Sequence, residues 1–296
     1  MSAPPLFSVI IATYNRPAQL NRCLAALAQI APPLGGFETV VIDDGGHEAL
    51  EAILAPYWEP LDLTLIQQLN AGPAAARNTG IAAARGAFAA FVDDDCIPPP
   101  AWLTQLENHV TAYPEVMVGG QVVNALTDNP FSAFSQQIVA IVYAHYNADP
   151  LDAQFLASNN MVVPLAGLRA LGGFTMTMRN SEDRDLCDRW RFSGRQIHYM
   201  PDITMLHGHA LTLDTFIRQH LSYGLGAHDF HNARAARGSG TMLEAARFHA
   251  NLDNWLINPL RGAQGLVGKA RVLALIALWQ GTNMLGYALR RFGRRA

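Results

Sequence analysis

Short apolar runs alternate with segments of helical periodicity over the first third of the chain, and this alternation limits the folds it can adopt. The strand-like runs are residues 7–12, 38–42, 61–67 and 87–92. Helices are expected between them where Leu20, Leu24 and Leu27 recur, near 47–54, and over 73–85. Strands that alternate with helices predict an α/β fold built on a mainly parallel, doubly wound sheet.

The alternation becomes irregular after residue 123. We expect a helix over 100–113 and a strand over 116–123, followed by an α+β arrangement. Its strands are predicted at 154–163, 195–201 and 203–206, and its helix at 181–192. Helices dominate from Thr212 onward, with a break at 237–240.

Charge is distributed unevenly along the chain. The formal net charge of the 296 residues is only −3, which gives no global reason to expect nucleic acid as a partner. From Thr212 onward, however, eleven Lys and Arg stand against four Asp and Glu, so this part carries +7 and the first 211 residues carry −10. We therefore expect the chemistry in the acidic part and a different role for the basic part.

Three consecutive aspartates, Asp93, Asp94 and Asp95, follow the strand-like run 88–92. Sheets of this type bind ligands beyond the carboxyl ends of their strands. Three adjacent carboxylates repel one another unless a cation lies among them, and such hard oxygen ligands favour Mg²⁺ or Mn²⁺. The alternative interpretation is a solvated turn or a helix cap before Pro98.

Two further acidic sites accompany this cluster. Asp43-Asp44 ends the strand 38–42 and precedes Gly45-Gly46, so it is either a ligand for nucleotide N–H and hydroxyl groups or an ordinary tight turn. The run 182–185 contains Glu182, Asp183 and Asp185 behind Ser181, a plausible helix N-cap. A position in the first turn of a helix, where negative charge is favourable, explains well why residues 182 and 185 are acidic.

The cysteines and the N-terminus indicate a cytoplasmic protein. Cys23, Cys96 and Cys187 are odd in number and unrelated in spacing, so neither a disulfide framework nor a zinc ligand set is predicted. Residues 1–6 lead directly into a strand without a charged leader or long apolar core, and we expect no signal peptide.

Six motifs occur in an order that resembles the family 2 glycosyltransferases of the GT-A fold. They are Val9-Ile10-Ile11-Ala12-Thr13-Tyr14-Asn15-Arg16, Val40-Val41-Ile42-Asp43-Asp44-Gly45, Ala76-Arg77-Asn78-Thr79-Gly80, Phe91-Val92-Asp93-Asp94-Asp95, Leu171-Gly172-Gly173-Phe174 and Glu182-Asp183. The resemblance covers roughly residues 6–210. It implies a catalytic domain over 1–211, with a nucleotide-binding half up to about 123 and an acceptor half over 124–211, and a helical extension over 212–296.

The resemblance also implies roles for individual residues. Asp44 and the Tyr14 region, which includes Thr13 and Asn15, would bind the nucleoside. Asp95 would be a direct metal ligand and Asp94, with Asp93 in the same motif, would lie near the ribose or diphosphate. Asp183 corresponds to the catalytic base. His207 resembles a histidine that some members use as a further ligand, and His209 is an alternative to it.

Two departures from the family pattern concern specificity. Asp-Asp-Gly-Gly replaces the usual Asp-Asp-Gly-Ser, and Thr175 stands where an aspartate is expected after Gly-Gly-Phe. The Gln-x-x-Arg-Trp signature of processive synthases is not found, because Gln219 is followed by neither the arginine nor the tryptophan. A single-addition enzyme is therefore expected.

The expected reaction is direct displacement at C1 of a sugar, which inverts the anomeric centre. Mn²⁺ or Mg²⁺ would neutralise the leaving diphosphate while a carboxylate removes the proton of the acceptor hydroxyl. UDP is the default donor nucleotide only by family resemblance, and the acceptor would be a sugar or a lipid-linked sugar, with a role in bacterial cell-surface glycan or glycolipid synthesis.

Three other residues have two interpretations each. Arg77 either reaches the acidic cluster or the diphosphate, or forms a structural ion pair with an aspartate. Trp102 either stacks on a sugar or, as we favour, packs in the core. Asn159 and Asn160 precede a strand and are candidates to face the donor sugar or the acceptor.

Two rival functions share some of these features. A sugar-phosphate nucleotidyltransferase would need a glycine- and lysine-rich phosphate loop after the first strand, whereas this chain has Thr13-Tyr14-Asn15-Arg16-Pro17 there and a single lysine, Lys269. A non-catalytic nucleotide-sugar-binding protein would be favoured if the metal or base aspartates were missing, and they are present.

The apolar segment 272–289 near the C-terminus falls just short of a clean membrane-spanning helix. Gln280, Asn283 and Tyr287 share one helical face, and basic residues flank both ends: Lys269, Arg271, Arg290, Arg291, Arg294 and Arg295. This pattern fits a peripheral helix on an anionic membrane surface. The alternatives are a helix packed against the catalytic domain or in a homodimer interface, and a spanning helix.

Overall fold

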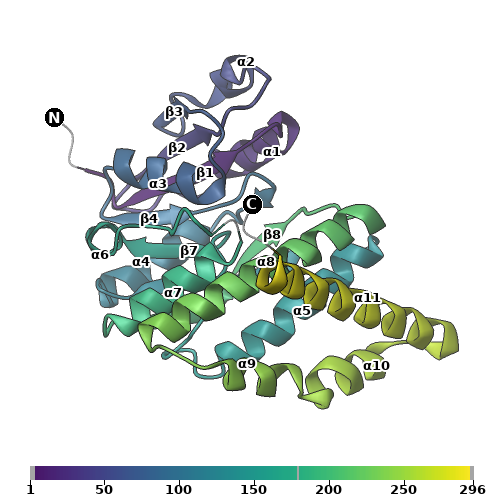
Figure 1. Ribbon diagram of the computed structural model, residues 1–296. Helices are drawn as coiled ribbons and strands as arrows, with labels where there is room; N and C mark the ends of the chain where they lie inside the picture. Colours follow the sequence, from purple (N-terminus) through teal and green to yellow (C-terminus); the bar gives the residue numbers. More distant parts are fainter. Residues whose placement is uncertain (1–3, 179, 294–296) are drawn as a thin grey trace.

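An eight-stranded mixed sheet organises the molecule (Figure 1). The computed structural model describes residues 4–178 and 180–293. The strand order is β3-β2-β1-β4-β7-β6-β8-β5. The strands are β1 (Phe7–Thr13), β2 (Phe37–Asp43), β3 (Leu63–Gln67), β4 (Phe88–Phe91), β5 (Cys96–Ile97), β6 (Met117–Asn124), β7 (Met161–Pro164) and β8 (Ile197–His207).

The first four strands of this order are parallel, as the strand–helix alternation predicts. β7 then pairs antiparallel with β4 and β6, β8 pairs parallel with β6, and the two-residue β5 pairs antiparallel with β8. The sheet is therefore dominated by parallel pairs, and the expected α/β architecture with a helical C-terminal part is confirmed.

Helices cover both faces of the sheet because successive strand side chains point to opposite sides. Val9 and Ile11 pack on the face covered by α1 (Pro17–Leu27) and α4 (Trp102–Ala112). Ile10 packs on the other face, against α3 (Pro73–Ala83), α6 (Leu165–Ala170) and α7 (Glu182–Phe192).

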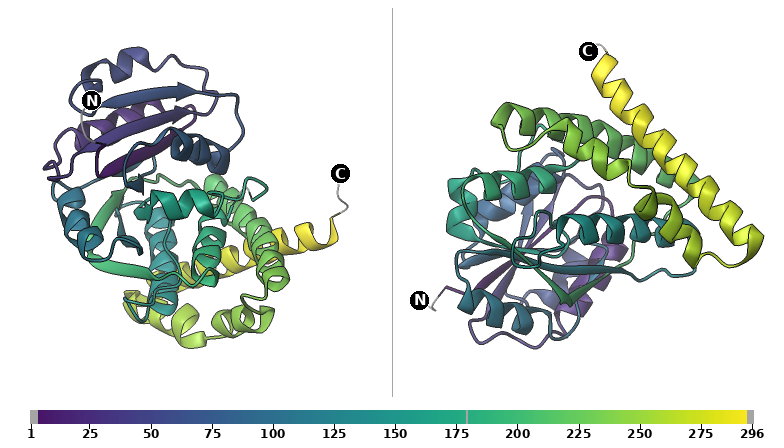
Figure 2. Two further views of the ribbon diagram at one scale, coloured as in Figure 1. Left: turned by 90° about the vertical axis from the view of Figure 1, so that its left-hand side faces the viewer. Right: turned by 90° about the horizontal axis from the view of Figure 1, so that it is seen from below.

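The C-terminal helices form a separate apolar cluster with one helix from the middle of the chain. This part contains α5 (Pro130–Tyr146), α8 (Leu213–Arg237), α9 (Met242–His249), α10 (Asn258–Gly262) and α11 (Gly265–Phe292). Phe134, Phe216, Trp255 and Trp279 are buried together in it. Figure 2 shows α11 at the outer edge of this helical part, away from the sheet.

Several element boundaries differ from the sequence predictions. The predicted strand 154–163 is a strand only at 161–164, because the Asn147 side chain accepts the backbone N–H groups of Gln154 and Phe155 and holds that segment as a loop. The strands 195–201 and 203–206 are one strand, β8, with a register shift against β6. The predicted helix 47–54 shrinks to α2 (Glu51–Leu54) and a 3₁₀ turn (Ala55–Tyr57).

Helix α5 was not predicted from the sequence, although its start signal is present. Asn129 is the N-cap and its side chain accepts the backbone N–H groups of Phe131 and Ser132, with Pro130 at the first helical position. The helix has no clean amphipathic pattern, because sheet-side neighbours cover one side of it and the C-terminal helices another.

Candidate active site

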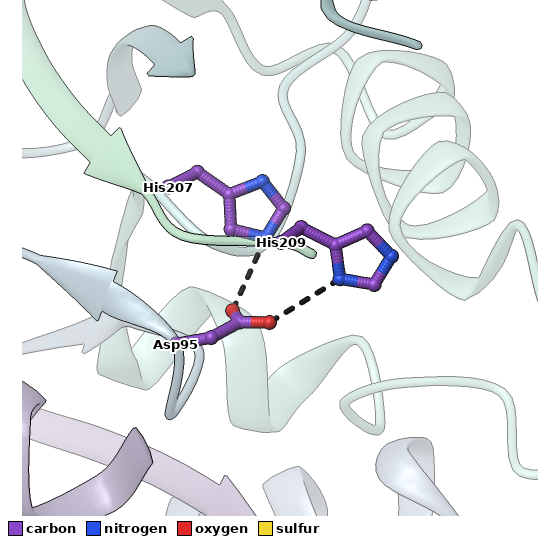
Figure 3. Close-up of side chains that lie close together, drawn as sticks. All are labelled: Asp95, His207 and His209. Atoms are coloured by element: carbon purple, nitrogen blue, oxygen red, sulfur yellow. Dashed lines mark hydrogen bonds and ion pairs between the residues drawn. The ribbon is translucent and has the colours of Figure 1, made fainter. Parts of the chain in front are cut away.

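Asp95, His207 and His209 form a compact group of potential metal ligands (Figure 3). His207 Nε2 lies 3.1 Å from Asp95 Oδ1, and His209 Nδ1 lies 3.4 Å from Asp95 Oδ2. The short β5 strand brings them together, since Cys96 pairs with His207 and the Gly208 N–H donates to the Asp95 carbonyl at 2.8 Å. The two histidines that the sequence offered as alternatives thus lie at the same carboxylate.

The electrostatics of this group favour an ionised aspartate. Burial alone would raise the pKa of Asp95, but the neighbouring His207 and His209 imidazoles and the Arg16 guanidinium outweigh it and hold that pKa well below its usual range. Burial opposes charging of His207, yet the adjacent Asp95 carboxylate raises the pKa of that imidazole. Asp95 Oδ1 is buried, and its contact among the described residues is the ion pair with His207. A divalent cation would take up both this oxygen and the imidazole nitrogen, so the residues fit a metal site.

The donor set also bears on the identity of the metal. Two imidazole nitrogens and one carboxylate suit a first-row transition ion such as Mn²⁺ better than Mg²⁺, which prefers oxygen ligands throughout. Asp95 has a side chain that is only 6% exposed, whereas His207 and His209 are 23% and 29% exposed. The group is therefore anchored on the protein side and open toward solvent.

Arg16 bridges the acidic cluster on its other side. Its Nη1 lies 3.2 Å from Asp94 Oδ1 and 3.2 Å from Asp95 Oδ2, while the side chain remains 44% exposed. Thr13 Oγ1 donates to Asp94 Oδ2 at 2.8 Å. Burial raises the pKa of Asp94 to about 6, although Arg16 and Thr13 act in the opposite direction. Sequence reasoning did not single out Arg16; its position directly after Thr13-Tyr14-Asn15 at the end of β1 was the available signal.

Arg77 joins the strand-end aspartates to helix α7. Its Nη2 lies 2.9 Å from Asp93 Oδ1 and its Nη1 lies 2.9 Å from Glu182 Oε1. Both ion pairs are made by an arginine with only 9% of its side chain exposed, so the guanidinium is committed to these two carboxylates. Arg77 thus reaches the acidic cluster, as one interpretation of the sequence predicted, and it does so through a buried structural ion pair with an aspartate, as the other predicted.

The Ala-Arg-Asn and Gly-Gly-Phe motifs lie against each other. Asn78 Nδ2 donates to the Phe174 carbonyl at 2.8 Å, and Asn78 Oδ1 accepts the Phe174 N–H at 2.8 Å. Gly173 has φ +68°, and a Cβ there would lie 2.3 Å from Asn78 Oδ1, so only glycine fits. Thr175, which replaces the expected aspartate, donates to Asp185 Oδ2 at 2.6 Å.

Asp183 lies in the first turn of α7, two residues after a strained residue. Ser181 has φ +67°, a left-handed conformation that costs a side-chain-bearing residue roughly 1 kcal/mol. Burial, followed by the charge of adjacent Glu182, raises the pKa of Asp183 to about 7. This is the range in which a carboxylate accepts protons efficiently near neutral pH. The other α7 acids are used elsewhere: Glu182 binds Arg77, and Asp185 binds Arg189 and Arg237.

The predicted nucleoside residues lie along one edge of the sheet, at the ends of β1 and β2. Asp44 is buried, and its oxygens accept from Gln68 Nε2 at 2.7 Å and from the N–H groups of Ala71 and Gly72 at 3.0 and 2.9 Å. It therefore fixes the loop before α3. Tyr14 is 44% exposed with its ring edge-on to His47, at 6.4 Å between centroids, and is the aromatic group available to a base. Asn15 Oδ1 accepts the His47 N–H at 2.8 Å.

Two other candidates from the sequence are core residues. Trp102 is fully buried, and its Nε1 donates to Asn160 Oδ1 at 3.0 Å. Asn160 is itself inaccessible and donates to the Ile203 carbonyl. Core packing of Trp102 is confirmed, and the idea that Asn160 faces a substrate is wrong. Asn159 differs, because its buried Oδ1 has no hydrogen-bond partner among the described residues.

A cavity of about 570 Å³ opens beside the metal-ligand group. Its lining includes Asp95, His209 and Tyr223 of α8. Desolvation of the Tyr223 hydroxyl, followed by the charges of Asp183, Glu182 and Asp93, raises its pKa, so these carboxylates act electrostatically on Tyr223. Its other residues are Arg16, Gln19, Arg22, Asn180, Gly208, Ala210, Leu211, Thr215, Arg218, Gln219 and Ser222.

Comparisons with known proteins agree on one family. The sequence profile described as glycosyl transferase family 2 matches residues 8–170, and that of glycosyl transferase family group 2 matches residues 90–289. The pre-mycofactocin glycosyltransferase of Mycobacterium tuberculosis is 28% identical over 224 residues, which cover 73% of this chain and 46% of that protein. Glycosyltransferase AglE of Haloferax volcanii is 34% identical over 124 residues, which cover 41% of this chain and 40% of that protein. The chain thus aligns with less than half the length of these curated relatives.

Solved structures resemble the chain over almost its whole length. The mannosyltransferase PcManGT from Pyrobaculum calidifontis, in complex with GDP-Man and Mn²⁺, has a TM-score of 0.69 and 19% identity, covering 99% of this chain and 89% of that one. S. aureus TarS 1–349 in complex with UDP-GlcNAc has a TM-score of 0.54 and 18% identity, covering 97% and 92%. At these identities the likeness shows the fold, which is GT-A. Because the family profile matches more than half of the sequence, the chain belongs to the family 2 glycosyltransferases.

Proposed function

We propose that the chain is an inverting glycosyltransferase that moves one sugar from a nucleotide-diphosphate sugar to an acceptor hydroxyl with the help of a divalent cation. The observation that carries this proposal is the group Asp95, His207 and His209, two members of which line a cavity, with Asp183 in electrostatic range of a residue of the same cavity wall. It combines a cation site with a carboxylate whose proton affinity suits a base.

The residues of the site divide into two roles. Asp95, His207 and His209 would hold the cation, which when bound neutralises charge on the leaving diphosphate. Asp183 would accept the proton of the acceptor hydroxyl, because a carboxylate with a pKa of about 7 is largely ionised just above neutral pH and still basic enough to take a proton. Attack from the side opposite the diphosphate inverts the anomeric centre.

Donor binding would use the edge formed by the ends of β1 and β2. Tyr14 offers an exposed ring to the base, and Thr13 and Asp44 hold the surrounding loops in place. UDP remains the default nucleotide by family resemblance, with GDP as the alternative. Asn159 Oδ1, which is buried with no hydrogen-bond partner among the described residues, would accept a hydrogen bond from a hydroxyl of the donor sugar. The acceptor would be a sugar or a lipid-linked sugar of a bacterial cell-surface glycan, used at the cytoplasmic face of the membrane.

A screen of nucleotides and metals tests the reaction class. Thermal shifts with UDP, GDP and dTDP, each with and without Mn²⁺, identify the nucleotide that stabilises the fold. Transfer to acceptor sugars is then followed by NMR of the anomeric proton, where the proposal expects inversion and metal dependence. A retained configuration would exclude direct displacement, and binding without donor turnover would favour a non-catalytic nucleotide-sugar-binding protein.

A further inference from the structure

Helix α11 exposes apolar side chains on its outer side, in addition to the apolar side that packs on the protein. Leu266, Ala270, Leu273, Ala277 and Met284, at spacings of three, four and seven residues, are all exposed on one side. We call this side the outer face of α11. Leu285, Leu289 and Phe292 are also at least half exposed near its end. The helix is long and apolar enough to cross a membrane by length and composition, yet only 17% of its most apolar window is buried.

The other side of α11 packs on the protein, through Trp279 in the apolar cluster and through close contacts with α8. The Asn283 carbonyl lies so close to Gly224 of α8 that a Cβ on Gly224 would overlap it. Gly286 meets the Leu221 carbonyl in the same way, so the two backbones touch where both helices carry glycine. The Tyr287 ring lies 5.2 Å from the His228 ring, and Arg290 Nε lies 2.9 Å from Asp229 Oδ1. These contacts fix which side of α11 faces outward.

An exposed apolar face of this length is expected to be covered in the working protein. The charges around this face indicate what covers it. From residue 245 to residue 293 the chain has six Lys and Arg and one acidic residue, Asp253. Within α11 there are Lys269, Arg271, Arg290 and Arg291, all exposed, and no acidic residue. Arg294 and Arg295, predicted to extend this basic flank, lie outside the described residues.

We propose that the outer face of α11 docks on an anionic lipid bilayer, with its apolar side chains at the boundary of headgroups and acyl chains and with Lys269, Arg271 and Arg291 on lipid phosphates. Interfacial helices of this kind bind through buried apolar area together with attraction to anionic lipid. A second copy of the chain fits less well, because pairing two outer faces in either direction brings the basic ends of one α11 against basic ends of the other, with no acidic residue of α11 between them.

The contacts with α8 also favour surface docking over spanning. Because α11 touches α8 through backbone at Gly224 and Gly286, a spanning α11 would carry α8 into the bilayer. α8 bears Arg218, Asp229 and Arg234, which are costly to bury in lipid. The same α8 lines the cavity beside the metal ligands, so docking holds that cavity one helix away from the membrane.

The test is flotation of the full chain with vesicles of phosphatidylcholine alone and of phosphatidylcholine with phosphatidylglycerol. We expect binding to rise with phosphatidylglycerol and to fall at high salt. L273E/M284E, which places two charges on the outer face, should lower binding at least about tenfold. K269Q/R271Q should lower binding to the anionic vesicles about tenfold and leave weak binding to neutral vesicles unchanged.

A matched control separates these effects from charge alone. L34E/L151E adds the same two charges at exposed leucines outside α11 and should bind like the unmodified chain. Circular dichroism and the thermal shift with nucleotide show whether each variant is folded, and they remain informative whether or not the proposed sugar transfer is correct.

Four outcomes would overturn the proposal. The first is failure of the full chain to float at low salt with any vesicle, and the second is binding of L273E/M284E equal to that of the control. A dimer in analytical ultracentrifugation that L273E/M284E dissociates would assign the outer face to a second copy. Resistance to carbonate extraction from vesicles would replace surface docking by a spanning helix.

Discussion

The Arg16 guanidinium lies between Asp94 and Asp95, with one nitrogen 3.2 Å from an oxygen of each carboxylate. It therefore supplies positive charge at the place where the proposed cation also needs these oxygens. The other proposed ligands, His207 and His209, contact Asp95 from the β8 side. Among the described residues, Arg16 is the only cationic side chain that pairs with both Asp94 and Asp95. A cation that binds Asp95 must compete with this ion pair.

Arg16→Ala is expected to tighten Mn²⁺ binding to the nucleotide-free protein about two- to fivefold, because Mn²⁺ would no longer have to displace the ion pair. This factor corresponds to the usual free energy of a partly exposed ion pair. Calorimetry with Mn²⁺ alone measures this. The matched control is Arg22→Ala, which removes another arginine of the same cavity wall and should leave Mn²⁺ affinity unchanged. Weaker Mn²⁺ binding in Arg16→Ala would show that Arg16 orients the carboxylates instead of competing for them.

Asp95→Ala is expected to abolish metal-stimulated nucleotide binding and nearly all transfer, because it removes the one carboxylate that both histidines contact. His207→Ala and His209→Ala should each weaken Mn²⁺ binding by about tenfold or more, and similar losses for the two would assign both as ligands. Electron paramagnetic resonance of bound Mn²⁺ checks all three variants. Unaltered Mn²⁺ dependence in Asp95→Ala would refute the assignment of the metal site.

Asp183→Asn is expected to lower kcat at least about 10²-fold while donor and metal affinities stay nearly the same. A base works only when deprotonated, so kcat of the unmodified enzyme should rise with pH and level off above about 7, where burial places the pKa of Asp183. The variant should lose this rising limb. If its kcat and pH profile match those of the unmodified enzyme, Glu182 becomes the candidate base.

The strand ends were predictable from the sequence because their signals are local. Each parallel strand is a short apolar run, and the polar residues after it, Asp44 and Asp95 among them, had to gather at one edge of the sheet. The link between Asp95 and His207 was not predictable in the same way. It depends on two residue pairs between β5 and β8, which join segments more than a hundred residues apart.

The orientation of α11 also lay beyond sequence reasoning. Periodicity showed that Gln280, Asn283 and Tyr287 share a face, but not whether that face meets water or protein. The answer depends on Gly224 of α8, whose missing side chain lets the α11 backbone approach at Asn283. Arg77 illustrates the same limit, since its partner Glu182 is 105 positions away.

His220 of α8 predicts an acid sensitivity of the fold. It is 1% exposed, neither ring nitrogen has a hydrogen-bond partner among the described residues, and Phe216 and Tyr223 contact the ring at centroid distances of 4.3 and 5.6 Å. Burial lowers the pKa of His220 from 6.5 to about 4. The unfolded chain therefore takes up a proton at higher pH than the folded chain does.

The free energy of unfolding should accordingly fall as the pH drops from about 6.5 to about 4, with His220 contributing about 3 kcal/mol to that loss. His220→Phe keeps an aromatic ring at this site and loses no hydrogen bond. Because phenylalanine does not titrate, the substitution should remove this part of the pH dependence. Urea unfolding across this pH range measures the effect, and His47→Gln, at an exposed histidine, is the control that should keep the full dependence. If His220→Phe loses stability on acidification as steeply as the unmodified chain, the loss must arise at other buried groups. His231 is the first of these to test, because burial also lowers its pKa to about 4.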